Sequence, residues 1–279
     1  MTQLIKIVRT LCKYFLPRPK KMCFYSKIKE LRDKLVENCK YAIGPLERTV
    51  DIIEKGSSIL ILEDRMNKTS SKTATSYSNP EGSEICLKTN DAPNAVHGSK
   101  SKDKIINDVY SVIHGVLIQE WEHFLYDLYA EGFVYYLNLG SPKSPLRLRQ
   151  LNPKMEVADM RQHICEEVKN SFRSLKELFA RTRSFFNVEE TKLFMEMQKH
   201  IQIRHIFQHS KGEIRSSDLE DIGRKSFDIL NDEGRVMSYG EGEDIPLSLP
   251  EIQKLYTVIE EYSEAFQKQA EKAKPVKAG

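Results

Sequence analysis

Three side chains suited to chemistry on a phosphate ester lie within six consecutive residues: Arg204, His205 and His209. Arginine carries a permanent positive charge on a planar fork that matches phosphate oxygens. Histidine titrates close to neutral pH and can therefore accept or deliver a proton. Together, these residue types predict a metal-independent site that cleaves or binds RNA.

Each of these side chains has a predicted role if the site is catalytic. RNA cleaves when its 2′-hydroxyl attacks the neighbouring phosphate, so the protein need not supply a nucleophile. His209 would transfer the proton, a contribution of about 10²–10⁴ in rate, and Arg204 would neutralise charge on the phosphate. His205 would orient the phosphate or act as a second acid or base. Lys211 is a supporting candidate for a phosphate contact, or simply a solvated residue at a helix end.

The element that must position these residues is a helix predicted over residues 187–210. Asn187 followed by Glu190 has the form of a helix start, and Gly212 is suited to the left-handed conformation that ends a helix. Five residues separate Arg204 and His209 by roughly 140° around such a helix. Both can reach one phosphate only if the helix bends or two chains meet, and we expect a composite Arg/His site at the two-fold axis of a homodimer.

A second predicted helix, over residues 104–138, supplies a partner for the arginine. Its apolar stripe contains Trp121, which we expect in the core, and Glu120, whereas Glu122 falls outside the stripe. A carboxylate that faces a core is costly unless it is paired. We therefore expect Glu120 to bind Arg204, with exposure of Glu120 at the edge of the stripe as the alternative.

The segment Arg204-His-x3-His209 running into Ser210-Lys-Gly212 resembles the Arg-x4-His motif of HEPN proteins, and is closest to the RiboL-PSP-like branch. Residues 119–125, Gln-Glu-Trp-Glu-His-Phe-Leu, are similar to the E-x-F-L pattern of that family's first core helix. The resemblance covers residues 104–272. It implies an up-and-down helical bundle, a homodimer, and a metal-independent endoribonuclease, such as a toxin or defence effector with an antitoxin or other regulatory partner. It also implies the alternative of a non-catalytic module for RNA binding or protein assembly.

The chain as a whole is predicted to be all-α, because strand signals are scarce. Residues 1–55 are expected to form a basic helical region with a break at Gly44-Pro45, and the Ser/Thr/Lys-rich residues 56–103 a flexible linker or long loop. We expect residues 104–272 to form the main domain and residues 273–279 a disordered tail. The helices expected in this domain span 104–138, 157–184, 187–210 and 248–272, the last with Pro250 in its first turn.

Positive charge is concentrated near the N-terminus. Residues 1–55 contain 13 Lys and Arg against 6 Asp and Glu, a net of +7, so the remainder of this +3 chain carries −4. An amphipathic pattern accompanies the charge, which fits RNA binding, a membrane surface or a helix docked on the core. Among the functional alternatives we favour RNA over a membrane, and the candidate contacts are Lys6, Arg9, Lys13, Arg18, Lys20 and Lys21.

Metal and cofactor chemistry is not predicted. His205 and His209 have the i, i+4 spacing of metal ligands, but the sequence offers neither an HExxH motif nor an evident third ligand. The five cysteines lack CxxC pairing, which favours a reducing compartment. With no recognisable secretory signal, the expected location is cytoplasmic.

Overall fold

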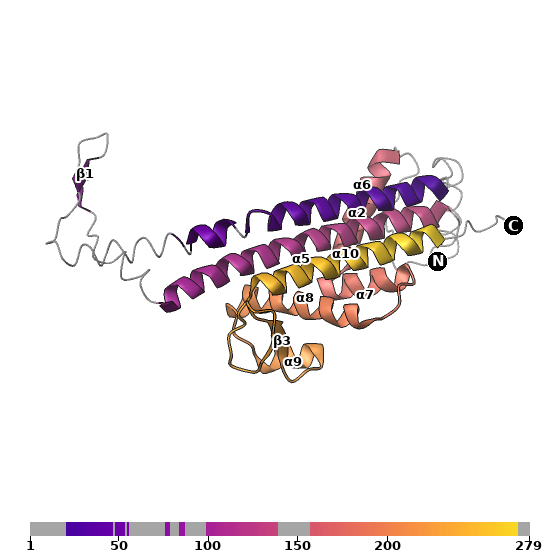
Figure 1. Cartoon of the computed structure of the whole chain (residues 1–279). Coiled ribbons are helices and arrows are strands. Elements are labelled where there is room, and N and C mark those ends of the chain that lie inside the picture. Colours follow the sequence, from indigo (N-terminus) through magenta and orange to yellow (C-terminus); the bar gives the residue numbers. More distant parts are fainter. Residues whose placement is uncertain are drawn as a thin grey trace.

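The computed structural model describes residues 21–46, 48–53, 55, 76–78, 84–86, 99–138 and 157–272 (Figure 1). The predicted all-α class is confirmed, since helices make up most of this part of the chain. They are α2 (Lys21–Ile43), α5 (Ser99–Asn138), α6 (Val157–Ser171), α7 (Leu175–Phe185), α8 (Lys192–Ser210), α9 (Ser216–Ile222) and α10 (Leu249–Lys272). Two short hairpins, β1 (Ser76–Ser78) with β2 (Glu84–Cys86) and β3 (Phe227–Leu230) with β4 (Val236–Tyr239), accompany them.

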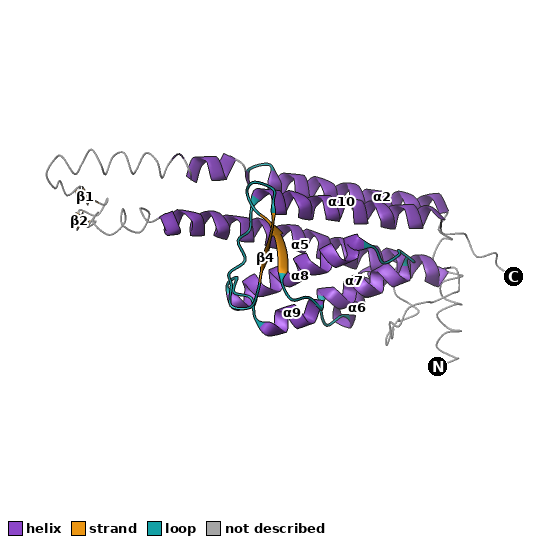
Figure 2. Ribbon diagram, turned by 60° about the horizontal axis from the view of Figure 1, so that its bottom comes forward, coloured by secondary structure: helices purple, strands orange, loops and turns teal. Residues whose placement is uncertain are grey.

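Helix α5 is the central element of the bundle. It contacts α2, α6, α7, α8 and α10, and Trp121, at its middle, is fully buried as expected. Helix α2 lies along α5 and α10 on one side, whereas α7 and α8 lie on the other side (Figures 1 and 2). An α-helix places successive residues 100° apart. Side chains two positions apart on α5 therefore reach opposite sides of the bundle.

Helix α2 shares the core of the bundle, although residues 1–55 were expected to be an N-terminal extension. Phe24, Ile28, Leu35 and Cys39 are buried in the same apolar cluster as the residues of α5 and α10. The predicted break at Gly44-Pro45 is confirmed, because α2 ends at Ile43 and helical structure resumes at residue 46. The described residues 21–46 are therefore an integral part of the fold.

The single helix predicted over 157–184 is wrong, because the structure has two helices, α6 and α7. The Ser174 hydroxyl accepts a hydrogen bond from the Glu177 amide at 3.1 Å, and the Glu177 carboxylate accepts one from the Arg173 amide at 3.2 Å. These bonds satisfy backbone donors at a helix start. The Ser-x-x-Glu pattern was visible in the sequence and marks the start of α7.

The predicted start of the next helix at Asn187 is also wrong. Asn187 has a left-handed backbone, with φ of 54°, and its amide bonds to the Ser184 carbonyl at the end of α7. Helix α8 begins later, at Lys192. At its other end Lys211 takes the left-handed conformation, with φ of 56°, and Gly212 follows with φ of 103°.

Two other boundaries bear on the predicted domains. Helix α5 begins at Ser99, so the proposed linker ends earlier than residue 103, and β1–β2 lies within it. The last helix begins as predicted, since α10 starts at Leu249 and the Ser248 hydroxyl accepts a hydrogen bond from the Glu251 amide at 3.2 Å.

The β3–β4 hairpin was not predicted. Its strands pair in antiparallel register from Phe227 opposite Tyr239 to Leu230 opposite Val236. Phe227 and Ile229 are buried, while the residues of β4 lie largely at the surface. The side-chain oxygen of Asn231 accepts hydrogen bonds from the Glu233 and Arg235 amides and closes the turn. Strands this short carry too little periodic signal for recognition from sequence.

Candidate functional site

The predicted catalytic residues all lie in the last two turns of α8. Arg204 is partly buried, whereas the side chains of His205 and His209 are exposed. Helix α8 stays helical through Ser210, so it has no break that would turn Arg204 and His209 to the same face. The angular separation expected from their spacing is therefore retained within one chain.

Arg204 pairs with a different glutamate from the one predicted. Its Nη1 donates to Oε2 of Glu122 at 2.8 Å, and both side chains are about one-fifth exposed, at 21% and 23%. Glu120 instead accepts a hydrogen bond from the side-chain Nδ2 of Asn38 at 2.7 Å. The predicted Arg204–Glu120 pair is therefore wrong. Both faces of α5 are covered, with α2 over Glu120 and α8 over Glu122, which a single apolar stripe does not reveal.

Arg204 and His205 line one groove of about 400 Å³ between α7, α8 and α9. Its other lining residues come from four helices: Glu122 of α5, Leu175 and Lys176 with Ser174 at the start of α7, Ile201, Gln202 and Gln208 of α8, and Asp221 of α9. Lys176 donates to the Asp221 carbonyl, and Gln202 donates to Asp218 at 2.9 Å. These bonds fix the walls of the groove. The groove thus presents an arginine, a lysine and a histidine to one space.

His209 does not line this groove but touches a residue that does. The rings of His205 and His209 lie with centroids 4.4 Å apart and planes tilted by 48°. The His209 carbonyl oxygen accepts a bond from Arg215 at 3.4 Å. His205 therefore lines the groove together with Arg204, whereas His209 contacts His205 from outside the groove. Lys211 is exposed at the helix end and is not among the groove residues.

A second histidine pair, which was not predicted from the sequence, lies buried between α5 and α8. Nε2 of His114 on α5 and Nδ1 of His200 on α8 are 3.3 Å apart, and both rings are almost fully buried. Next to them Lys199 binds Glu251 at 2.6 Å and the Asp228 carbonyl at 3.0 Å. This polar cluster ties α8 to α10 and the β3–β4 hairpin. No periodicity signals it, because its members come from α5, α8 and α10, which are far apart in the sequence.

Most of the cations predicted to contact RNA lie outside the residues that the structure describes. Lys6, Arg9, Lys13, Arg18 and Lys20 lie outside the described residues, and Lys21 is described only as the first residue of α2. Among the residues that are described, no group of three or more His, Cys, Asp or Glu side chains is arranged to hold a metal ion. None of the described helices is long and apolar enough to cross a membrane.

Comparison of the chain with protein-family models, with curated proteins and with solved structures gave no match in any of the three.

Proposed function

We propose that this protein is a HEPN-like, metal-independent endoribonuclease that acts in the groove between α7 and α8. The observation that carries the proposal is that Arg204 and His205 line one groove in a single chain, with the His209 ring against His205. Arginine has five N–H donors. The contact of Nη1 with Glu122 therefore orients the guanidinium and leaves other donors for phosphate oxygens.

In the proposed reaction the 2′-hydroxyl oxygen of RNA attacks the adjacent phosphorus, and the bond from phosphorus to the 5′-oxygen breaks. His205 accepts the 2′-proton, and a proton is returned to the leaving 5′-oxygen either by His205 itself or by His209, whose ring lies against it. Arg204 and Lys176 neutralise the charge that builds on the phosphate. The products are a 2′,3′-cyclic phosphate and a 5′-hydroxyl, and DNA is not cleaved because it lacks the 2′-hydroxyl.

This site does not need a second chain to bring an arginine and a histidine together. A complementation test distinguishes this intrachain site from the composite Arg/His site at a homodimer axis that was expected from the sequence. If the site were composite, a mixture of Arg204→Ala and His209→Ala chains would recover activity, because one of its sites would be intact. An intrachain site predicts no recovery.

The primary test is incubation of labelled structured RNA with the protein in excess EDTA. Arg204→Ala and His205→Ala should each lower the cleavage rate by about 100-fold or more. The matched control is His123→Ala, an exposed histidine of α5 outside the groove, which should cleave like the wild type. Cleavage that survives both groove substitutions would overturn the proposal.

A second function is favoured by the Arg204–Glu122 ion pair itself. If that pair only joins α5 to α8, the protein is a non-catalytic helical module that binds RNA or assembles with a partner such as an antitoxin. Glu122→Gln separates the two functions. A nuclease should cleave RNA in its wild-type form, whatever the cleavage rate of the variant. A non-catalytic module should show no cleavage from either form, and the variant should lose only thermal stability.

A further inference from the structure

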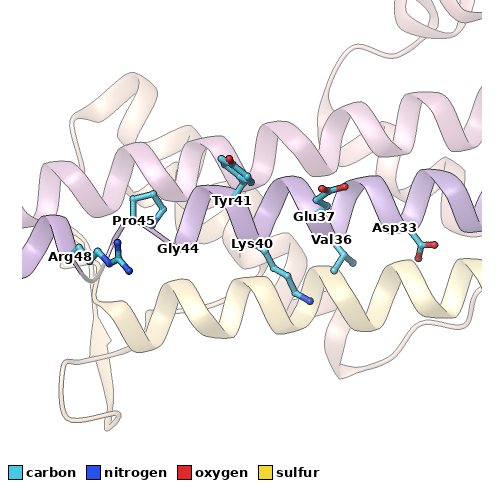
Figure 3. A pocket seen from close by; sticks show the side chains of 8 residues that line it. All are labelled: Asp33, Val36, Glu37, Lys40, Tyr41, Gly44, Pro45 and Arg48. Carbon is cyan, nitrogen blue, oxygen red and sulfur yellow. The ribbon is translucent and has the colours of Figure 1, made fainter.

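The outward face of α2 carries an exposed tyrosine beside a shallow hollow. Tyr41 is 84% exposed, more than any other large apolar side chain in the described part of the chain. The hollow, of about 660 Å³, lies along α2 where the helix breaks at Gly44-Pro45 (Figure 3). A large aromatic side chain in this position gains free energy when a partner covers it.

The charged residues that line this hollow are ordered by sign. Asp33 and Glu37 lie toward one end and Arg48 toward the other, with Lys40 and Tyr41 between them (Figure 3). All four charged side chains are exposed. Within the described residues, the one ion pair that involves any of them is Asp33 with Arg32, at 3.8 Å. Such exposed pairs hold little free energy, so these charges are available to a partner.

We propose that the occupant of this face is a second copy of the chain, packed with its α2 antiparallel to the first. A face that is acidic at one end and basic at the other is complementary to itself only when turned end for end. A parallel arrangement would place like charges together, which costs free energy. Two-fold symmetry makes every contact occur twice.

One register pairs the opposite charges at the two ends of the hollow. When Asp33 lies opposite Arg48 of the second copy, the two-fold axis falls between residues 40 and 41. The two Tyr41 rings then meet close to the axis, and Val36 lies opposite Pro45. Glu37 faces Gly44, whose missing side chain permits close approach. The contact from residue 33 to residue 48 spans roughly 22 Å of helix.

This dimer leaves the proposed ribonuclease grooves free. Helix α2 covers one side of α5 and α10, and the groove beside α8 lies on the other side (Figure 2). The inference is therefore independent of the proposed function. A chain that fails to dimerise should still cleave RNA, and a chain that fails to cleave should still dimerise.

Sedimentation velocity of the full chain tests the proposal through charge reversal. The wild type, of 32.3 kDa per chain, should sediment as a dimer. Arg48→Glu and Asp33→Arg should each weaken association by about 100-fold, because each variant creates two repulsive contacts of roughly tenfold. An equimolar mixture of these two variants restores opposite charges at both contacts and should dimerise again. Tyr41→Ala should weaken the dimer without any change in charge.

The matched control is Arg235→Glu, on the exposed turn of the β3–β4 hairpin, with a side chain 77% exposed. It should remain dimeric. A monomeric wild type would overturn the proposal, as would a dimer that survives both charge reversals or variants whose mixture stays monomeric. A dimer that is insensitive to α2 but lost in Arg204→Ala would instead place the interface at α8.

Discussion

At the scale of single residues, the buried cluster around Lys199 and Glu251 contains two histidines, His114 and His200, whose pKa values are lowered. Burial, followed by the positive charges of Lys199 and Arg204, lowers the pKa of His114 to about 3. Burial and the charge of Lys199 also lower the pKa of His200 well below its usual value. Both rings are therefore neutral in the folded protein near pH 7, so one ring nitrogen of the pair can donate a hydrogen bond to the other.

We predict that acid destabilises the fold through these two histidines. In the unfolded chain they titrate near pH 6.5, so below that pH the unfolded state binds more protons than the folded state. Stability is thus fully present above about pH 6.5 and falls as the pH decreases toward the folded pKa. At pH 5.5 the two histidines together should remove about 3 kcal/mol. Urea unfolding at pH 7.5 and 5.5 measures this loss.

Two variants assign the acid effect to the pair. His200→Gln keeps a hydrogen-bonding side chain but removes one titrating group, so about half of the loss between pH 7.5 and 5.5 should disappear. His123→Gln, an exposed position on α5, should retain the wild-type loss. If His200→Gln shows the same pH dependence as the wild type, another group is responsible.

The glutamate that pairs with Arg204 could be predicted only in part from the sequence. The sequence predicted a carboxylate from the middle of α5 as the partner, and such a carboxylate is present. It is Glu122 rather than Glu120 because α2 also packs on α5, and its Asn38 binds Glu120. The apolar stripe of a helix identifies one buried face, but a central helix has several, and their assignment depends on contacts far apart in the sequence.

At the scale of elements, the two glycines of α5 differ in how closely other residues pack against them. A Cβ atom at Gly132 would lie 2.6 Å from a ring atom of Phe185 and 2.8 Å from one of Phe186, both buried. A Cβ atom at Gly115 would meet nothing within 4 Å. The close approach of α5 to the end of α7 therefore depends on Gly132 and not on Gly115.

We predict that alanine has opposite effects at these two positions. Gly115→Ala should stabilise the protein by up to about 1 kcal/mol, because alanine favours the helix. Gly132→Ala gains the same preference but must displace the aromatic rings, an overpacking cost of about 1–3 kcal/mol. We therefore expect net destabilisation, measured by urea unfolding. Equal effects from the two substitutions would show that Phe185 and Phe186 move aside freely.

The elements also show which sequence signals are strong. The long helices α5 and α10 were predicted close to their observed bounds, because each is a long run of residues without a proline in its interior. The split between α6 and α7 was missed, since the apolar pattern runs through both and only the Ser174 cap marks the boundary. The β3–β4 hairpin was missed because its buried residues are few.

At the scale of the whole molecule, α2 joins the basic N-terminal region to the bundle. Among the described residues, the members of α2 in the apolar core include Phe24, Ile28, Leu35 and Cys39, and residues 1–20 precede this helix. Five cations lie in that segment, Lys6, Arg9, Lys13, Arg18 and Lys20, with no acidic residue. Replacing all five with glutamine changes the net charge from +3 to −2.

We predict that this neutralised variant binds RNA more weakly and with a shallower dependence on salt. Each phosphate contact with a single strand contributes about 0.7 to the slope of log affinity against log salt concentration, so five contacts would account for about 3.5. Fluorescence anisotropy with labelled single-stranded RNA measures the slope. A matched neutralisation of Lys225 and Arg235, exposed near or in the β3–β4 hairpin, should leave it unchanged. An unaltered slope in the five-site variant would instead assign RNA contact to the groove beside α8, where Lys176 and Arg204 supply the positive charge.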